Sequence, residues 1–246
     1  MSATELSLLL LLILAAATLY SSVGHGGASG YLAAMVLFGV APSTMKPAAL
    51  VMNIGVASIA AWKFWRAGHF RWDLLWPFAI TSIPLAFVGG AIQLSIPAYR
   101  MIVAVALLVA AARFIITPHW AHPNPKRPPL WIAMIVGAIV GVVSGMTGVG
   151  GGIFLSPLLL FLGWAEARET AGVAAPFIVV NSIAGLLGHT ASLQHLPPEL
   201  PWMAFAAVTG GLVGSYLGAR RATPAVFRRL LGVVLVVAAV KFLLEK

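Results

Sequence analysis

The chain has 246 residues, of which 61% are hydrophobic and 9% are charged, and its formal net charge is +9. Soluble domains average about 25% charged residues, so this composition, with a mean hydropathy of +0.99, excludes an ordinary soluble fold. The sequence contains no cysteine, which excludes disulfide frameworks, thiolate catalysis and cysteine-ligated metal sites. Lys and Arg flank apolar runs instead of forming one patch, which argues against nucleic acid as a partner and indicates helices in a lipid bilayer.

Ten apolar segments follow one another along the chain, and most are long enough to approach or cross a hydrocarbon layer of about 30 Å at about 1.5 Å per residue. We therefore predict an all-α integral membrane protein. Glu5 replaces the basic start of a secretory signal peptide, so the first segment is expected to remain as a helix. The predicted helical segments cover residues 6–20, 29–40, 47–65, 74–94, 99–116, 130–146, 153–162, 170–191, 200–219 and 225–244.

The segment 117–129 (TPHWAHPNPKRPP) resists helix formation because it is rich in proline. It is the predicted linker between a first transmembrane repeat, 1–116, and a second, 130–246. The halves align when Gly24-His25-Gly26-Gly27 is laid on Gly148-Val149-Gly150-Gly151. Each half has five segments, an odd number, so the second copy is expected to enter from the opposite face. Two inverted repeats of this kind are typical of secondary transporters.

The distribution of positive charge predicts an orientation, because the cytoplasmic loops of membrane proteins are enriched in Lys and Arg. With both termini outside, most basic residues fall on the inner side. The predicted inner residues are Lys63, Arg66, Arg71, Arg113, Lys126, Arg127, Arg168, Arg220, Arg221, Arg228 and Arg229, and the outer ones are Lys46, Arg100, Lys241 and Lys246. A multi-pass protein with both termini outside is therefore predicted.

Two predicted segments, 29–40 and 153–162, are only about 18 Å and about 15 Å long as helices, which is too short to span a bilayer. Each follows a glycine run and is expected to begin near mid-depth. Irregular backbone at that depth is tolerated only where it is buried in protein or lines a wet cavity. The free N–H groups at the start of each short helix favour an anion, whereas the carbonyl end of the preceding helix would suit a cation, so helix dipoles alone leave the sign of the ligand open.

The acidic residues favour the anion, since all of them fall at predicted segment ends or in loops, and cation-coupled carriers often keep a carboxylate at mid-membrane. His25 could contact an anion or relay a proton. The alternative is that the glycine runs serve only close helix packing and that the Asn amides bond across helices. The candidate substrate-binding residues are Gly24, His25, Gly26, Gly27, Ser29, Asn53, Thr147, Gly148, Gly150, Gly151, Gly152 and Asn181. No cofactor is expected.

The paired motifs Gly24-His25-Gly26-Gly27 and Ser144-Gly145-Met146-Thr147-Gly148-Val149-Gly150-Gly151-Gly152 resemble those of the TauE/SafE sulfite exporter family. The resemblance covers nearly the whole chain. It implies export of sulfite, sulfoacetate or a related organosulfur anion across the bacterial inner membrane, and it implies a homodimer. In that membrane, the orientation predicted from charge places both termini in the periplasm. The first motif carries His25 where the second has Val149, so the two half-sites are not expected to be equivalent.

Two other functions remain open from the sequence. A channel could use the same backbone donors without alternating access. An intramembrane serine protease is the less favoured alternative: Gly27-Ala28-Ser29-Gly30 resembles the Gly-x-Ser-Gly motif of rhomboid proteases, and His189 would supply the base. The repeat does not require such a dyad, and no phosphate-binding loop of the Gly-x-x-x-x-Gly-Lys type is present. Transport without ATP hydrolysis, and no enzymatic activity, is the prediction.

Overall fold

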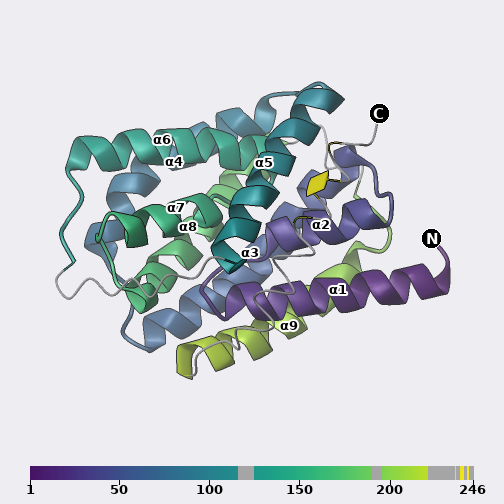
Figure 1. The fold of residues 1–246 in the computed structure, drawn as a ribbon, viewed down its shortest axis with the longest axis horizontal. Helices are drawn as coiled ribbons and strands as arrows, with labels where there is room; N and C mark the ends of the chain where they lie inside the picture. Colours follow the sequence, from purple (N-terminus) through teal and green to yellow (C-terminus); the bar gives the residue numbers. More distant parts are fainter. Residues whose placement is uncertain (116–124, 190–195, 221–235, 237–238, 241–242, 244–246) are drawn as a thin grey trace.

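The structure, a computed structural model, describes residues 1–115, 125–189, 196–220, 236, 239, 240 and 243. The described ranges contain helices and no strand, so the all-α prediction is confirmed there (Figure 1). In chain order the helices are α1 (Ala3–Ser21), α2 (Ala28–Leu37), α3 (Pro42–Arg66), α4 (Trp72–Ala91), α5 (Ile96–Ile115), α6 (Leu130–Thr147), α7 (Gly152–Phe161), α8 (Ala167–Gly188) and α9 (Leu200–Arg220). Over the described residues, six of them are long and apolar enough to cross a membrane: α1, α3, α4, α6, α8 and α9.

Each of the first nine predicted segments matches one helix, with shifted ends that have local causes. Helix α3 begins at Pro42, five residues before the prediction, because a proline at the first helical position gives up no hydrogen bond. Helix α8 begins earlier because Glu166 and Glu169 form a reciprocal cap around its first turn. Most of the tenth predicted segment, 225–244, and residues 117–124 of the linker lie outside the described residues.

The helices run side by side, and two pairs of them fold back at glycine runs (Figure 1). Helix α1 starts at the end of the bundle that carries Met1, and α2 returns to that end, which is here called the Met1 end. Helix α6 starts at the opposite end, where α3 reaches Arg66, and α7 returns to it. This end is here called the Arg66 end. The two breaks therefore point into the bundle from opposite ends.

Helices from the two halves of the chain interleave. Helix α3 packs against α8 and α9, while α4 packs against α6 and α8. Glycines of α6 at every fourth position make the α4 contact close, because a Cβ on Gly137, Gly141 or Gly145 would collide with a backbone carbonyl of α4. Small residues at such spacing are how membrane helices approach each other without a hydrophobic driving force. The interleaving brings both breaks to α3 and α8.

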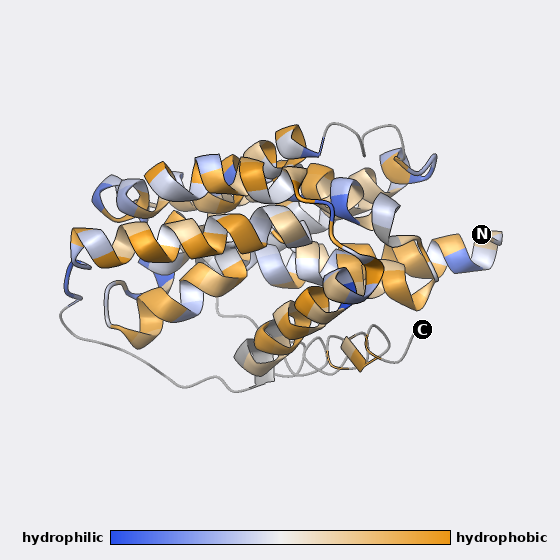
Figure 2. Cartoon of the chain, turned by 90° about the horizontal axis from the view of Figure 1, so that it is seen from above, coloured by the Kyte–Doolittle hydropathy of each residue, from blue (hydrophilic) through white to orange (hydrophobic). Residues whose placement is uncertain are grey.

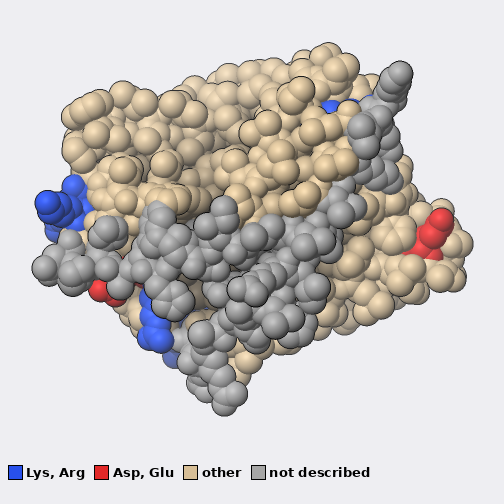
Figure 3. Space-filling view, viewed as in Figure 1, with Lys and Arg blue, Asp and Glu red and all other residues tan. Residues whose placement is uncertain are grey.

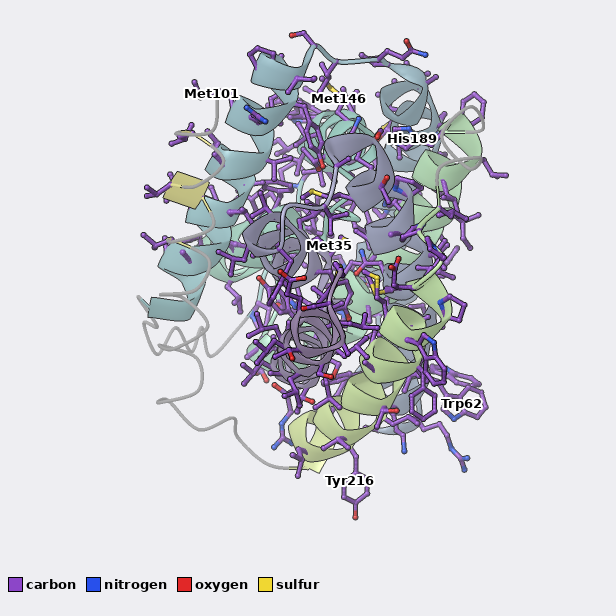
Figure 4. The ribbon with its side chains drawn as sticks, turned by 90° about the vertical axis from the view of Figure 1, so that its right-hand side faces the viewer. Met35, Trp62, Met101, Met146, His189 and Tyr216 are labelled. Atoms are coloured by element: carbon purple, nitrogen blue, oxygen red, sulfur yellow. The ribbon has the colours of Figure 1, made fainter. Side chains whose placement is uncertain are left out.

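The outer surface of the bundle suits a bilayer. Apolar colour covers most of the outward faces in Figure 2, and large apolar side chains such as Leu11, Ile139 and Phe205 are more than half exposed. Trp62 and Tyr216 point outward from α3 and α9 in Figure 4, as aromatic residues do at a membrane interface.

Charged side chains gather at the Arg66 end, the left edge of Figure 3. Arg71 joins three segments there: it lies 2.8 Å from Asp73 on α4 and 3.3 Å from Glu169 on α8. The hydrogen bond to Asp73, together with the negative charge of both carboxylates, raises the pKa of Arg71 further above its usual range. Arg127 adds a contact of 3.4 Å to Asp73. These charges fix the end of the bundle and lie away from the breaks.

Candidate functional site

The two glycine breaks meet inside the bundle, and Asn53 of α3 joins them. The Asn53 side chain is fully buried. Its Oδ1 accepts from the backbone N–H of Ala28, the first residue of α2, at 3.2 Å. Its Nδ2 donates to the carbonyl of Val149 in the second break at 3.1 Å and to Ser182 Oγ of α8 at 3.3 Å. One side chain thus caps the short helix of the first break and holds the backbone of the second.

His25 makes a second bridge between the breaks. Its Nδ1 lies 2.9 Å from the carbonyl of Val23, and since a carbonyl only accepts, Nδ1 carries the hydrogen. Its Nε2 lies 3.0 Å from Ser156 Oγ and 3.2 Å from the carbonyl of Gly152, both at the start of α7. A neutral ring accepts from Ser156, whereas a protonated ring can donate to Gly152. Both protonation states therefore have a partner in the opposite break.

The glycines at the two breaks are required by the backbone itself. The residues preceding α2 and α7, Gly27 and Gly151, have φ angles of +105° and +78°, a region that residues with a Cβ rarely adopt. Gly26 has no unusual φ, but a Cβ there would collide with Asn53 Oδ1. A Cβ on Gly150 would collide with Asn53 Nδ2 and Ser182 Oγ. Close packing is thus one role of the runs, and it brings the backbone of both breaks against the Asn53 side chain.

Backbone N–H groups accumulate at this point without partners. Within the described chain, the N–H groups of Ser29 and Gly30 in the first turn of α2 and those of Gly150 and Gly151 in the second break donate no hydrogen bond. Buried N–H groups are almost always paired, with protein, water or a ligand. Both short helices also direct the positive end of their dipole toward the interior. The arrangement can therefore accept an anion or water.

A small cavity of about 10 Å³ lies between the two breaks, and of the four residues with unpaired N–H groups Ser29 lines it. Its walls come from both breaks and from their neighbours on α1, α2, α7 and α8: Tyr20, His25, Gly26, Gly27, Ala28, Ser29, Val149, Ile153 and Ile178. A void of roughly 10–15 Å³ holds about one water molecule. An anion with four heavy atoms needs several times this room, so the described conformation is closed around the site.

Two tyrosines of α1 and α2 hydrogen-bond to the first break, and one of them, Tyr20, lines the cavity. Tyr20 accepts from Ser29 Oγ at 2.6 Å, and Tyr31 donates to the carbonyl of Gly26 at 2.5 Å. Both tyrosines are buried. They bind the Ser29 hydroxyl and the Gly26 carbonyl, which Asn53 does not reach. The sequence prediction missed Tyr20, Tyr31 and Ser156. The signal that could have revealed the tyrosines is their position just before and after a glycine run inside an apolar segment.

The other predicted residues lie nearby with different roles. Thr147 Oγ1 donates to the carbonyl of Val143 in its own helix, at 2.7 Å, and does not line the cavity. Asn181 Nδ2 donates to Phe177 of its own helix at 2.8 Å, and within the described residues its buried Oδ1 has no partner. Gly24 packs against Ala171 of α8. Thr147 and Gly24 are therefore positioned as packing residues, while Asn181 retains an unused acceptor.

The geometry offers no support for a Ser29–His189 dyad. Ser29 Oγ donates to Tyr20, and His189 Nε2 lies 3.2 Å from the carbonyl of Gly145. No hydrogen bond joins Ser29 to His189 in the described part of the chain, which is the contact that a base needs to activate a nucleophile. His189 ends α8, as expected of a structural residue.

Comparison with known proteins identifies the group to which these features belong. The family model described as "Sulfite exporter TauE/SafE" matches residues 9–242. The chain belongs to the TauE/SafE family. It is 39% identical over 228 residues to the "Probable membrane transporter protein y4hK" of Sinorhizobium fredii, covering 91% of this chain and 92% of that protein. It is also 22% identical to the "Probable membrane transporter protein YjnA" of Bacillus subtilis, over 80% of this chain and 84% of that one. No solved structure matches.

Membership in the TauE/SafE family confirms the resemblance based on the paired glycine motifs, and both motifs lie within the matched region. TauE/SafE proteins are membrane transporters, which agrees with the apolar surface and the membrane-length helices of this chain. The protein is a multi-pass membrane protein of a transporter family.

Proposed function

We propose that the protein exports a small anion, sulfite or a related organosulfur anion such as sulfoacetate, across the bacterial inner membrane, and that the paired breaks form its binding site. The observation that carries this proposal is the set of backbone N–H groups in the two breaks that donate no hydrogen bond within the described chain, one of which, that of Ser29, belongs to a residue lining the shared cavity. An oxyanion accepts several hydrogen bonds at once, and helix N-termini bind such groups in many proteins.

The positions of the acidic side chains support a negatively charged substrate. In the described part of the chain, every Asp and Glu lies before a helix or in its first turn: Glu5, Asp73, Glu166, Glu169 and Glu199. A carboxylate beside the cavity would repel an anion, and none lines it. The donors without a partner are backbone N–H groups; Asn53 Nδ2 already donates to Val149 and Ser182, and His25 Nε2 donates only when the ring is protonated.

We assign the Arg66 end to the cytoplasm and the Met1 end to the periplasm, because Lys and Arg gather at the Arg66 end (Figure 3). The fold-back of α1–α2 from one end and α6–α7 from the other supports two inverted repeats. In such transporters the two repeats move against each other around a fixed site. The homodimer implied by the family resemblance belongs to this proposal, and the mass of the purified protein in detergent tests it.

A closed cavity of about 10 Å³ supports a carrier in preference to a channel, since a conducting pore needs a continuous path. Passage of an anion then requires the breaks to separate on one side at a time. A negative cell interior drives an anion outward by about 2.3 kcal/mol per charge per 100 mV. Export therefore needs no coupled ion in this proposal.

The test is sulfite flux in liposomes that contain the purified protein, with membrane potential and pH gradient set independently. We expect saturable sulfite flux that follows the potential, competes with sulfoacetate and persists without a pH gradient. Liposomes without protein, and liposomes with the Asn53→Leu variant, are the controls. Absence of flux with sulfite, sulfoacetate, sulfate and chloride would overturn the proposal, and flux that stops when the pH gradient is removed at fixed potential would overturn its uncoupled form.

A further inference from the structure

Lys46 is a buried cation on the side of the glycine breaks that faces the Met1 end. It lies in the second turn of α3, and only 9% of its surface is exposed. Within the described residues, no Asp or Glu pairs with it. A buried ammonium normally has a paired carboxylate, because removing the charge from water is costly. Lys46 was expected from the sequence to mark only the outer side of the membrane.

The backbone of Lys46 lies directly against the second break. Gly148, the residue that ends α6, is so close that a Cβ on it would lie 3.2 Å from the carbonyl oxygen of Lys46 and 3.3 Å from its Cα. Asn53, which bridges the two breaks, lies two turns further along the same helix. Along α3, Lys46 therefore lies between the site and the Met1 end of the bundle, with its backbone at the edge of the second break.

The groups around Lys46 leave its charge unneutralised. Its Nζ lies 4.8 Å from the centre of the Tyr99 ring of α5, a contact that replaces only part of the hydration the ammonium has lost. At His189, the residue that follows α8, burial and then the nearby positive charge of Lys46 lower the pKa to about 4, so the imidazole is neutral at physiological pH. Figure 4 looks onto this end of the bundle, with His189 beside α3. An aromatic face and a neutral imidazole leave room for an anion as the partner of the ammonium.

We propose that Lys46 binds the transported anion on its path between the paired breaks and the periplasm. The inference rests on the proposed function and adds to it a charged, specificity-determining contact that the glycine motifs lack. The backbone N–H groups of the breaks can hold an anion or a water molecule, whereas the buried ammonium selects for negative charge. The ligand class is a small oxyanion, with oxygens that accept from the ammonium while the breaks open toward the Met1 end.

The experiment compares wild type, Lys46→Met, Lys46→Arg and Lys63→Met in the liposome assay, with sulfite supplied from the periplasmic side. Lys63 is the matched control because it lies on the same helix at the opposite end of the bundle and away from the cavity. Lys46→Met should raise the half-saturating sulfite concentration by about tenfold or more, since a hydrogen bond to a charged partner contributes more than a neutral one. Lys46→Arg should restore most of the affinity, and Lys63→Met should match wild type.

A purely structural role for Lys46 gives a different result. It would lower the amount of folded protein or the maximal rate while leaving half-saturation unchanged, and Tyr99→Leu would reproduce that loss. If Lys46→Met does not fold, wild type, Lys46→Gln and Lys46→Arg are compared in detergent instead. The quantity measured is the shift in melting temperature that sulfite causes, which decides equally between anion binding and a structural role for Lys46. Wild-type half-saturation in a folded charge-removing variant overturns the role of Lys46 and leaves the proposed function intact, whereas a wild-type protein without any anion flux overturns both.

Discussion

Replacing Asn53 with alanine should separate the two glycine breaks. The substitution removes the acceptor of the Ala28 N–H and the donor to the Val149 carbonyl, both of which are buried. A buried polar group left without a partner costs about 1–3 kcal/mol, so the two groups together should cost about 2–6 kcal/mol. Since each kcal/mol lowers the melting temperature of a chain of this size by about 2–4 °C, we expect a drop of about 10 °C.

Asn181→Ala is the matched control for Asn53→Ala. Asn181 is equally buried, but its only hydrogen bond goes to a carbonyl of its own helix, and its Oδ1 has no partner within the described residues. Its removal should cost less than about 1 kcal/mol, because no group outside α8 loses a partner. Thermal unfolding of the two variants in the same detergent, followed by intrinsic tryptophan fluorescence, measures the difference. Equal melting temperatures for both variants would refute the bridging role of Asn53.

Two further substitutions test the break itself. Gly26→Ala places a methyl group against the Asn53 side chain and should lower sulfite flux at least about tenfold. Gly55→Ala is the control and should retain flux, because the nearest neighbour of the added methyl group is a side-chain methyl at 3.4 Å. Equal flux in the two variants would count against the close approach at the first break. Ser29→Ala removes the bond to Tyr20 and should change flux by less than about fivefold, since a neutral hydrogen bond contributes about 1 kcal/mol. Complete loss of function in the Ser29 variant would instead favour a nucleophilic serine.

The location of the breaks could be predicted from the sequence because two independent signals coincide. A glycine run permits a sharp change of direction, and an apolar segment of about half the membrane thickness follows each run. Both short helices lie where they were predicted: each starts one residue before the prediction, and they end three residues (α2) and one residue (α7) before it. The position of the acidic residues at helix starts was also predictable, because a charged side chain at the end of a membrane helix lies outside the hydrocarbon layer and stays in contact with water.

The contacts between the two breaks could not be predicted, because they depend on how helices distant in sequence pack. Alignment of the halves places Ser58 on Ser182, yet Ser58 is exposed and Ser182 is buried against Asn53. The alignment gives equivalent positions, but it does not tell which residue of an aligned pair is directed toward the other half of the chain. Lys46 shows the same limit: its place near a helix end predicts exposure, and only the packing of α5 and α6 around it makes it buried.

The most direct test of the account is sulfite counterflow in liposomes. Vesicles preloaded with unlabelled sulfite, at zero membrane potential and with equal pH on both sides, receive a trace of radiolabelled sulfite outside. A carrier whose closed site at the paired breaks opens to one side at a time should accumulate label above its equilibrium level, and Gly26→Ala should abolish that accumulation. Label that enters only to equilibrium, or accumulation that persists unchanged in the Gly26→Ala variant, would contradict alternating access at this site.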